Sequence, residues 1–216
     1  MNKIDLYKRA QDLMPYALEF YGDKYKSVVK DTFSHSDIDI MNAIEAETFT
    51  STIKGYHSYR DDINGNYKHV IRVKDEPKYL DTILVHELFG HGVLSNKRPY
   101  VTKNGIVYIR NGIQLTDYTD HSKIYHKTLN EGIVEYIANE IKALYQKRDL
   151  SFCSFEAYNI ARLLFEIFGK EKMLKLLINN KGDLSKELDF FDEMSRKLDE
   201  RDSDMSTYNL KLIRRL

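Results

Sequence analysis

The stretch Val85–Gly92, with the sequence VHELFGHG, places two imidazoles and one carboxylate within six residues of an apolar segment. His86, Glu87 and His91 supply these groups. The apolar run 80–94 that contains them is too long for a typical strand and predicts a helix. Two histidines and a glutamate on one apolar helix are an unusual set for packing alone, so the stretch predicts a functional site.

The spacing of the two histidines predicts a distorted helix. In the familiar His-Glu-x-x-His arrangement the histidines are four residues apart and share one helix face, whereas His86 and His91 are five apart. An ideal α-helix would turn their side chains about 140° away from each other. A π-bulge adds one residue to a turn and brings both to one side. We expect such a bulge here, with Gly90 tolerating unusual backbone angles and leaving room beside an ion.

A third ligand is predicted on a later helix. Zinc binds three protein ligands in catalytic sites and keeps a fourth position open. Glu131 and Glu135 lie one turn apart in the segment LNEGIVEY, inside a helix expected over 124–144. If Glu131 binds the ion, Glu135 can accept a hydrogen bond from the second nitrogen of a ligand histidine and fix its tautomer. The predicted ligands are therefore His86, His91 and Glu131, and the predicted cofactor is Zn²⁺.

Together the two segments resemble the metal-binding core of the zincin metallopeptidases of the gluzincin type, in which one helix supplies two histidines and the next a glutamate. The His-Glu motif with glycine before the second histidine is similar to that of the dipeptidyl peptidase III family. The tyrosine carboxypeptidases related to the microtubule-detyrosinating enzymes share the longer spacing and a Glu-Gly pair like Glu131-Gly132. The resemblance covers about residues 84–136 and implies a zinc-dependent peptidase acting on a peptide or protein substrate.

This chemistry gives individual residues expected roles. The ion would lower the pKa of its bound water and polarise the scissile carbonyl. Glu87 would act as the general base, taking a proton from that water and delivering it to the leaving amine. A further donor should stabilise the oxyanion, and Tyr158 or His121 is preferred for that role. The remaining candidates for the oxyanion donor are Tyr118, Tyr125 and His126.

The segments on either side of the metal helix have two interpretations each. By the same resemblance, strand 67–73 would be an edge strand that pairs with an extended substrate, although it can equally be an ordinary strand of the sheet. The basic residues that follow the helix would clamp a substrate carboxylate or, more commonly for such residues, form a solvated face. These basic residues are Lys97, Arg98, Lys103 and Arg110.

Hydrophobic periodicity and turn signals predict an α+β fold. It would be a mainly helical zincin-like domain with a small antiparallel sheet before the metal-binding helix. We expect a single domain over 1–216, with an N-terminal lobe at 1–121 and a helical C-terminal lobe at 122–216. The expected helices are the first twenty residues despite Pro15, a short one at 37–46, 80–94, 124–144, one ending at 168, and 170–179. The expected hairpins join 48–59 to 67–73 and 101–102 to 106–109.

Composition excludes several classes of partner. The 216 residues include 33 Lys+Arg and 33 Asp+Glu, so the net charge is zero and no cationic surface for nucleic acid is expected. The sequence contains no run of about 18 apolar residues, so no membrane span is expected. The single cysteine, Cys153, excludes a disulfide framework and favours a cytoplasmic protein. Other residues are expected to serve packing or the surface: His35, His57, His69, and the tyrosines at 7, 16, 21 and 25.

Two alternatives to a general peptidase stay open at this point. One is a catalytically inactive zincin-like protein that works as a binding module or scaffold. Glu87 speaks against it, because a structural zinc site has no need of a carboxylate beside its first ligand. The other is a phage or bacterial effector protease with one specific protein target, which would use the same chemistry on a narrower substrate.

Overall fold

The computed structural model describes residues 2–48, 54–61, 67–95, 99–101, 107–117, 119–120, 123–147 and 156–178. The chain groups into two compact units, unit 1 with residues 1–94 and 137–151 and unit 2 with residues 95–136 and 152–216. Helix α5, Lys127–Gln146, contributes its first half to unit 2 and its second half to unit 1. The expected lobes, 1–121 and 122–216, stay a prediction.

Helix α1, Lys3–Tyr21, opens unit 1 as the sequence predicts. A capping box starts it: the Asn2 side chain accepts from the Asp5 amide, and the Asp5 carboxylate accepts from the Asn2 amide. Gly22, with φ of 73°, ends it, and Pro15 lies inside without ending it. The buried face recurs at helical spacing and consists of Leu6, Ala10, Leu13, Ala17, Phe20 and Tyr21.

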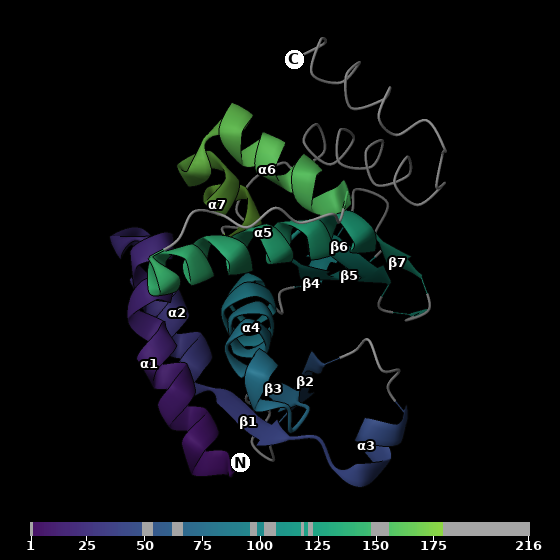
Figure 1. Cartoon of the computed structure of the whole chain (residues 1–216). Helices are drawn as coiled ribbons and strands as arrows, with labels where there is room; N and C mark the ends of the chain where they lie inside the picture. The colour runs from purple at the N-terminus through teal and green to yellow at the C-terminus, as the bar shows by residue number, and fades with distance from the viewer. Residues whose placement is uncertain are drawn as a thin grey trace. The chain divides into compact units, whose positions relative to one another are not determined.

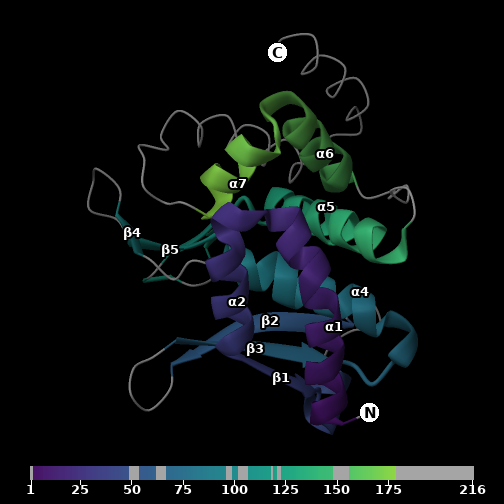
Figure 2. The same cartoon turned by 90° about the vertical axis from the view of Figure 1, so that its left-hand side faces the viewer.

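The remainder of unit 1 is a small sheet with helices packed on it (Figures 1 and 2). Its segments are η1 (Asp23–Tyr25), α2 (Lys26–Ser34), β1 (Ser36–Ile40), α3 (Ala43–Thr48), β2 (Gly55–Asp61), β3 (Tyr67–Val73), η2 (Pro77–Tyr79), α4 (Leu80–Leu84) and η3 (Val85–Gly92). The predicted helix over 80–94 is confirmed as α4 and η3, which follow one another without a break. This helix contacts β2 and β3, and it also packs against α1 and α2.

The sheet of unit 1 has the strand order β1-β3-β2. Strands β2 and β3 form the predicted antiparallel hairpin, with Gly55 opposite Val73 and Asp61 opposite Tyr67. Strand β1 adds to the other side of β3 in the parallel direction, so the sheet is mixed and not antiparallel as expected. Strand β3 is therefore central and paired on both sides. The expectation that residues 67–73 form an edge strand for substrate is wrong, because β1 occupies that edge.

The segment that forms β1 was expected to be helical. Ser36–Ile40 is instead a strand, and only Ala43–Thr48 is helical, as α3. Local propensity is a weak guide here, because the pairing of Ile38 with Ile71 buries both side chains in the core. Tertiary pairing thus decides the conformation of this short segment.

Asp37 on β1 is a buried carboxylate held by two cations. The Lys3 ammonium donates to it at 2.5 Å, and the Arg72 guanidinium donates at 3.3 Å. Burial alone would raise the pKa of Asp37, but the hydrogen bond from Lys3 and the charges of Lys3 and Arg72 outweigh it, so the pKa is lowered. The ionised form is therefore favoured in the folded protein.

We expect Asp37→Asn to destabilise the protein in a pH-dependent way. Because the folded pKa lies below the unfolded value of about 3.9, the contribution of Asp37 is fully present above that value and is lost as pH falls through the folded pKa. At pH 7 the variant should lose about 1–2 kcal/mol of unfolding free energy, since Lys3 is half exposed and partly screened. Urea denaturation at pH 7 and pH 3 measures this, with Asp39→Asn at an exposed partner of Lys3 as control. An equal loss at both pH values would contradict the linkage.

Unit 2 combines a second sheet with helices. Its antiparallel strands, in the order β4-β5-β6-β7, are Pro99–Val101, Val107–Asn111, Gln114–Asp117 and Ile124–Tyr125. The hairpin of β4 and β5 is confirmed. Strands β6 and β7 were not predicted, because the polar residues of 116–122 obscure them; the turn between β5 and β6 uses Gly112 at φ of 59°.

The helices of unit 2 follow the prediction. Helix α5 begins at Lys127 and not at Ile124, which belongs to β7. Helices α6, Glu156–Phe168, and α7, Lys170–Ile178, lie side by side and are separated by Gly169 at φ of 78° (Figure 1). The fold class is therefore α+β. Among the helices in the described ranges, none has the length and apolar character that crossing a membrane requires.

Candidate metal centre

The helix that carries the two histidines is π-helical. Segment η3 has this form over the whole stretch Val85–Gly92. As a result His86 and His91 meet on one side, with ring centroids 5.1 Å apart and planes at 71°. The distortion expected from the five-residue spacing is confirmed, and it extends over eight residues, further than a single bulge.

Gly90 and Gly92 both lie in η3. The described glycines with positive φ are Gly22, Gly112 and Gly169, so Gly90 needs no left-handed backbone. The close approach occurs at Gly92, where an added Cβ would lie 3.0 Å from Cγ2 of Thr32 on α2. Gly92 thus lets the end of η3 pack tightly on α2.

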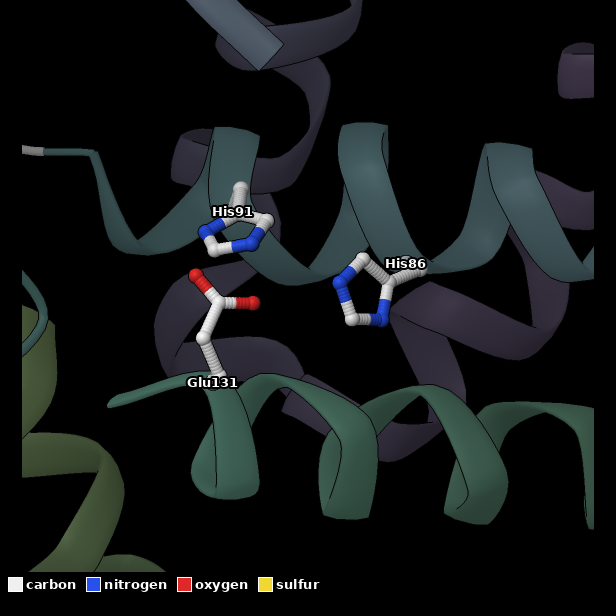
Figure 3. Close-up of side chains that lie close together, drawn as sticks. All are labelled: His86, His91 and Glu131. Carbon is white, nitrogen blue, oxygen red and sulfur yellow. The ribbon is translucent and has the colours of Figure 1, made fainter. Parts of the chain in front are cut away.

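Glu131 completes a group of three potential ligands. Each of His86, His91 and Glu131 offers one donor atom, and these atoms all lie within 4.8 Å of one another. Figure 3 shows the three side chains pointing toward one another, the histidines from η3 and the glutamate from α5. Donor atoms of a tetrahedral zinc ion lie about 3.4 Å apart, which is within this limit. Two imidazoles and one carboxylate are a donor set that fits zinc.

The first turns of α5 are anchored within unit 2 on both sides of Glu131. Before it, Asn130 is fully buried and its Oδ1 accepts from the Ile113 amide at 3.1 Å, which ties the β5–β6 turn to the helix. After it, a Cβ on Gly132 would lie 2.3 Å from the carbonyl oxygen of Ala157 on α6. Glu131 therefore sits at a point where the backbone has little freedom to move.

Glu87 follows the first histidine and is 9% exposed. Its neighbour across the helix–sheet contact is Gly55 at the start of β2, where an added Cβ would lie 3.3 Å from Cγ of Glu87. The backbone of β2 thus packs directly on the stem of this carboxylate. Gly55 is a functional candidate that sequence reasoning missed, because only the folded chain brings it beside Glu87.

Two histidines expected to serve packing lie next to the candidate centre. The His57 ring on β2 stacks on that of His91, with centroids 6.3 Å apart and planes at 6°. Nε2 of His57 lies 3.0 Å from Nδ1 of His69 on β3, a hydrogen-bond distance. Burial, followed by the nearby His91 and His69, holds the pKa of His57 well below its usual value, so it is neutral at neutral pH. His35, in contrast, is exposed and lies beside Asp31.

Several predicted residues have a described position but no tested role. Glu135 lies on α5, four residues after Glu131, and is partly exposed. Tyr158 on α6 is 2% exposed, and its ring packs near Tyr136. His126 is buried just before α5, with φ of 58°. The roles of Glu135 and Tyr158 stay predictions.

Other predictions fall on residues of which the structure describes nothing or only the backbone. His121 and Tyr118, candidates for the oxyanion donor, lie outside the described ranges. The same holds for Cys153 and for the basic residues at 97, 98 and 103. For Tyr125 and Arg110 the structure gives the strand position alone, in β7 and β5.

Comparisons of this chain with protein-family models, with curated proteins and with solved structures gave no match.

Proposed function

We propose that this protein is a zinc-dependent metallopeptidase, with His86, His91 and Glu131 as metal ligands and Glu87 as general base. The observation that carries the proposal is the convergence of these three donor atoms within 4.8 Å. The π-helical register supports it, since it brings together two histidines that an α-helix would keep apart. Glu87 adds the group that hydrolysis needs and metal binding does not.

The residues divide the chemistry between them. A zinc ion bound by this group would supply Lewis acidity toward water and the scissile carbonyl. Glu87, one residue after the first ligand, would take the proton of the attacking water and pass it to the leaving amine. Gly55 leaves room for the stem of Glu87, since a Cβ at this position would lie 3.3 Å from its Cγ. Tyr158 or His121 is proposed as the donor to the oxyanion.

The substrate in this proposal is an extended peptide or a protein segment. Strand β2 is paired only with β3 among the described residues, so its other side is an edge, and it contacts η3 directly. Backbone hydrogen bonds along such an edge bind a peptide with little dependence on its sequence. We propose that the substrate pairs with β2 and not, as first expected, with β3. A cytoplasmic location is also proposed, since the single Cys153 offers no structural disulfide.

Zinc binding by ligand variants tests the metal part of the proposal. We expect about one zinc per chain in the dialysed wild-type protein, measured by mass spectrometry of the metal. His91→Ala and Glu131→Ala should each weaken the affinity more than about 100-fold, since removing a ligand costs more than removing a group behind it. His35→Ala is the matched control, an exposed histidine outside the group. A wild-type protein without zinc affinity, or unchanged affinity in His91→Ala, would overturn the proposal.

A further inference from the structure

A buried tyrosine reaches the backbone of the π-helix. The hydroxyl of Tyr21, the last residue of α1, donates to the carbonyl oxygen of Phe89 at 2.5 Å. Tyr21 is 2% exposed and Phe89 is fully buried. This hydrogen bond joins residues 68 positions apart and is made in a part of the core that excludes solvent.

The carbonyl of Phe89 lies near the C-terminal end of the π-helical segment, where the hydrogen-bond pattern becomes tighter. Segment η3 is π-helical up to Gly92, and there the Val93 amide already donates to the carbonyl of Gly90, three residues back. The pattern of backbone hydrogen bonds therefore changes at this end of the helix. A hydrogen bond from outside the helix can stabilise one of the two patterns here. The hydroxyl of Tyr21 supplies that hydrogen bond one residue before Gly90.

Helix α2 supports the same end of η3. The end of η3 approaches Thr32 closely at Gly92, where an added Cβ would lie 3.0 Å from Cγ2 of Thr32. Tyr21 is placed for its contact by the end of α1 at Gly22 and by its edge-to-face packing on Phe20, with ring centroids 5.1 Å apart. The C-terminal half of η3, which includes His91, is thus fixed by α1 and α2 together.

We propose that Tyr21 is a positioning residue, whose hydrogen bond to Phe89 keeps η3 in the π-helical register and thereby holds His91 beside His86. The proposal builds on the metal-binding function proposed above and adds a residue outside the ligand group. Long π-helices are rare, so an α-helical register competes with this one. In that register a separation of five residues turns His91 about 140° away from His86.

Tyr21→Phe removes the donor and keeps the ring. The carbonyl of Phe89 then has no solvent to replace the hydroxyl, because both residues are buried. Without this hydrogen bond the helix loses a contact that holds its π-helical register, and a shift toward the α-helical register displaces His91. We therefore expect zinc affinity to fall about 10- to 100-fold, the range for groups that orient ligands without touching the metal.

The matched control is Tyr7→Phe. Tyr7 also lies on α1, and its hydroxyl also donates to a backbone carbonyl, that of Ser36 on β1, at 2.6 Å. It accepts from the Ile38 amide as well, so the control loses at least as many hydrogen bonds. A general loss of stability would affect both variants, whereas a change in ligand geometry should appear only in Tyr21→Phe.

The experiment measures zinc affinity by competition with a chromophoric chelator, and the visible absorption of the Co²⁺-substituted proteins. We expect weaker zinc binding and an altered Co²⁺ spectrum for Tyr21→Phe, with Tyr7→Phe within about twofold of wild type in affinity. Combining Tyr21→Phe with His91→Ala should add no further loss, because both remove the same ligand. Wild-type affinity and spectrum in Tyr21→Phe would overturn the proposal.

A metal-free measurement separates this proposal from the proposed function. In the metal-free protein, with chelator present, nuclear Overhauser effects between residues five apart report the π-helical register of η3. They should weaken in Tyr21→Phe but not in Tyr7→Phe. If wild type binds no zinc, the metallopeptidase proposal fails, while these contacts still decide the role of Tyr21. If Tyr21→Phe does not fold, the hydroxyl proton of Tyr21 in wild type decides it: slow exchange with solvent is expected, and fast exchange would refute the hydrogen bond.

Discussion

Glu87→Gln is expected to abolish peptide hydrolysis while the protein keeps its zinc. Glutamine preserves the size of the side chain, so packing against Gly55 and the rest of η3 should be retained. It removes the group that accepts and returns a proton, a contribution of about 10²- to 10⁴-fold in rate. Zinc affinity should stay within about threefold of wild type, since Glu87 is not one of the three convergent donors. Loss of activity with retained metal distinguishes a base from a ligand.

A mixture of many peptides and proteins serves as substrate in this assay. Wild-type protein is incubated with a peptide library from a digested proteome and with intact proteins of a host extract, and mass spectrometry identifies new termini. Termini that require zinc and wild-type Glu87 are expected. Cleavage confined to one intact protein would identify a specific effector protease. The control, Glu76→Gln, changes a surface glutamate that pairs with Lys54, and it should cleave as wild type does. Equal cleavage by Glu87→Gln would refute the assigned role.

Gly132→Ala is expected to destabilise the protein although alanine is the better helix former. The added Cβ would lie 2.3 Å from the carbonyl oxygen and 2.4 Å from the carbonyl carbon of Ala157. These are backbone atoms and cannot rotate aside, so α5 and α6 must separate. We expect a loss of about 1–3 kcal/mol in unfolding free energy, against a gain of about 1 kcal/mol from helix propensity alone. Because Glu131 is the preceding residue, zinc affinity should fall as well.

A second substitution tests whether the contact with backbone is the cause. Ala157→Gly removes the Ala157 Cβ, which lies 2.7 Å from the added atom, but leaves the two closer backbone contacts. It should therefore fail to rescue Gly132→Ala in urea denaturation. Full rescue would show that the side chain of Ala157 limits the approach of the helices. Higher stability in Gly132→Ala alone would contradict the close crossing.

The candidate site was predictable from the sequence where the signal is local. The five-residue spacing of His86 and His91 on a helical pattern leaves a π-helix as the way to bring them together, and η3 has that form. The position of Glu131 followed from its own helix and from the ligand count of zinc. Gly55 and Tyr21 could not be found this way, because each acts on η3 from a segment far away in sequence.

The fold was predictable to a similar extent. Long helices and hairpins with Asn-Gly turns carry their own signal, and α1, α5 and the β2–β3 pair appear where expected. Strand β1 has no such signal, since its two aspartates disfavour a strand and only pairing with β3 makes it one. Because β1 was not predicted, β3 was expected at the edge of the sheet and not at its centre. A single short strand thus altered the expected substrate edge.

Unit 1 consists of two separate segments of the chain, so its parts can assemble only in a certain order during synthesis. The β2–β3 hairpin can close as soon as Val73 leaves the ribosome, whereas β1 must wait for β3, about thirty residues later. The last part of unit 1 comes from the second half of α5, where Tyr145 receives a hydrogen bond from Arg9 and packs edge-to-face on Tyr16. A nascent chain released at Leu94 would contain both histidines without these contacts. Helix α1 therefore acquires its final neighbours only after the first part of unit 2, residues 95–136, has been translated.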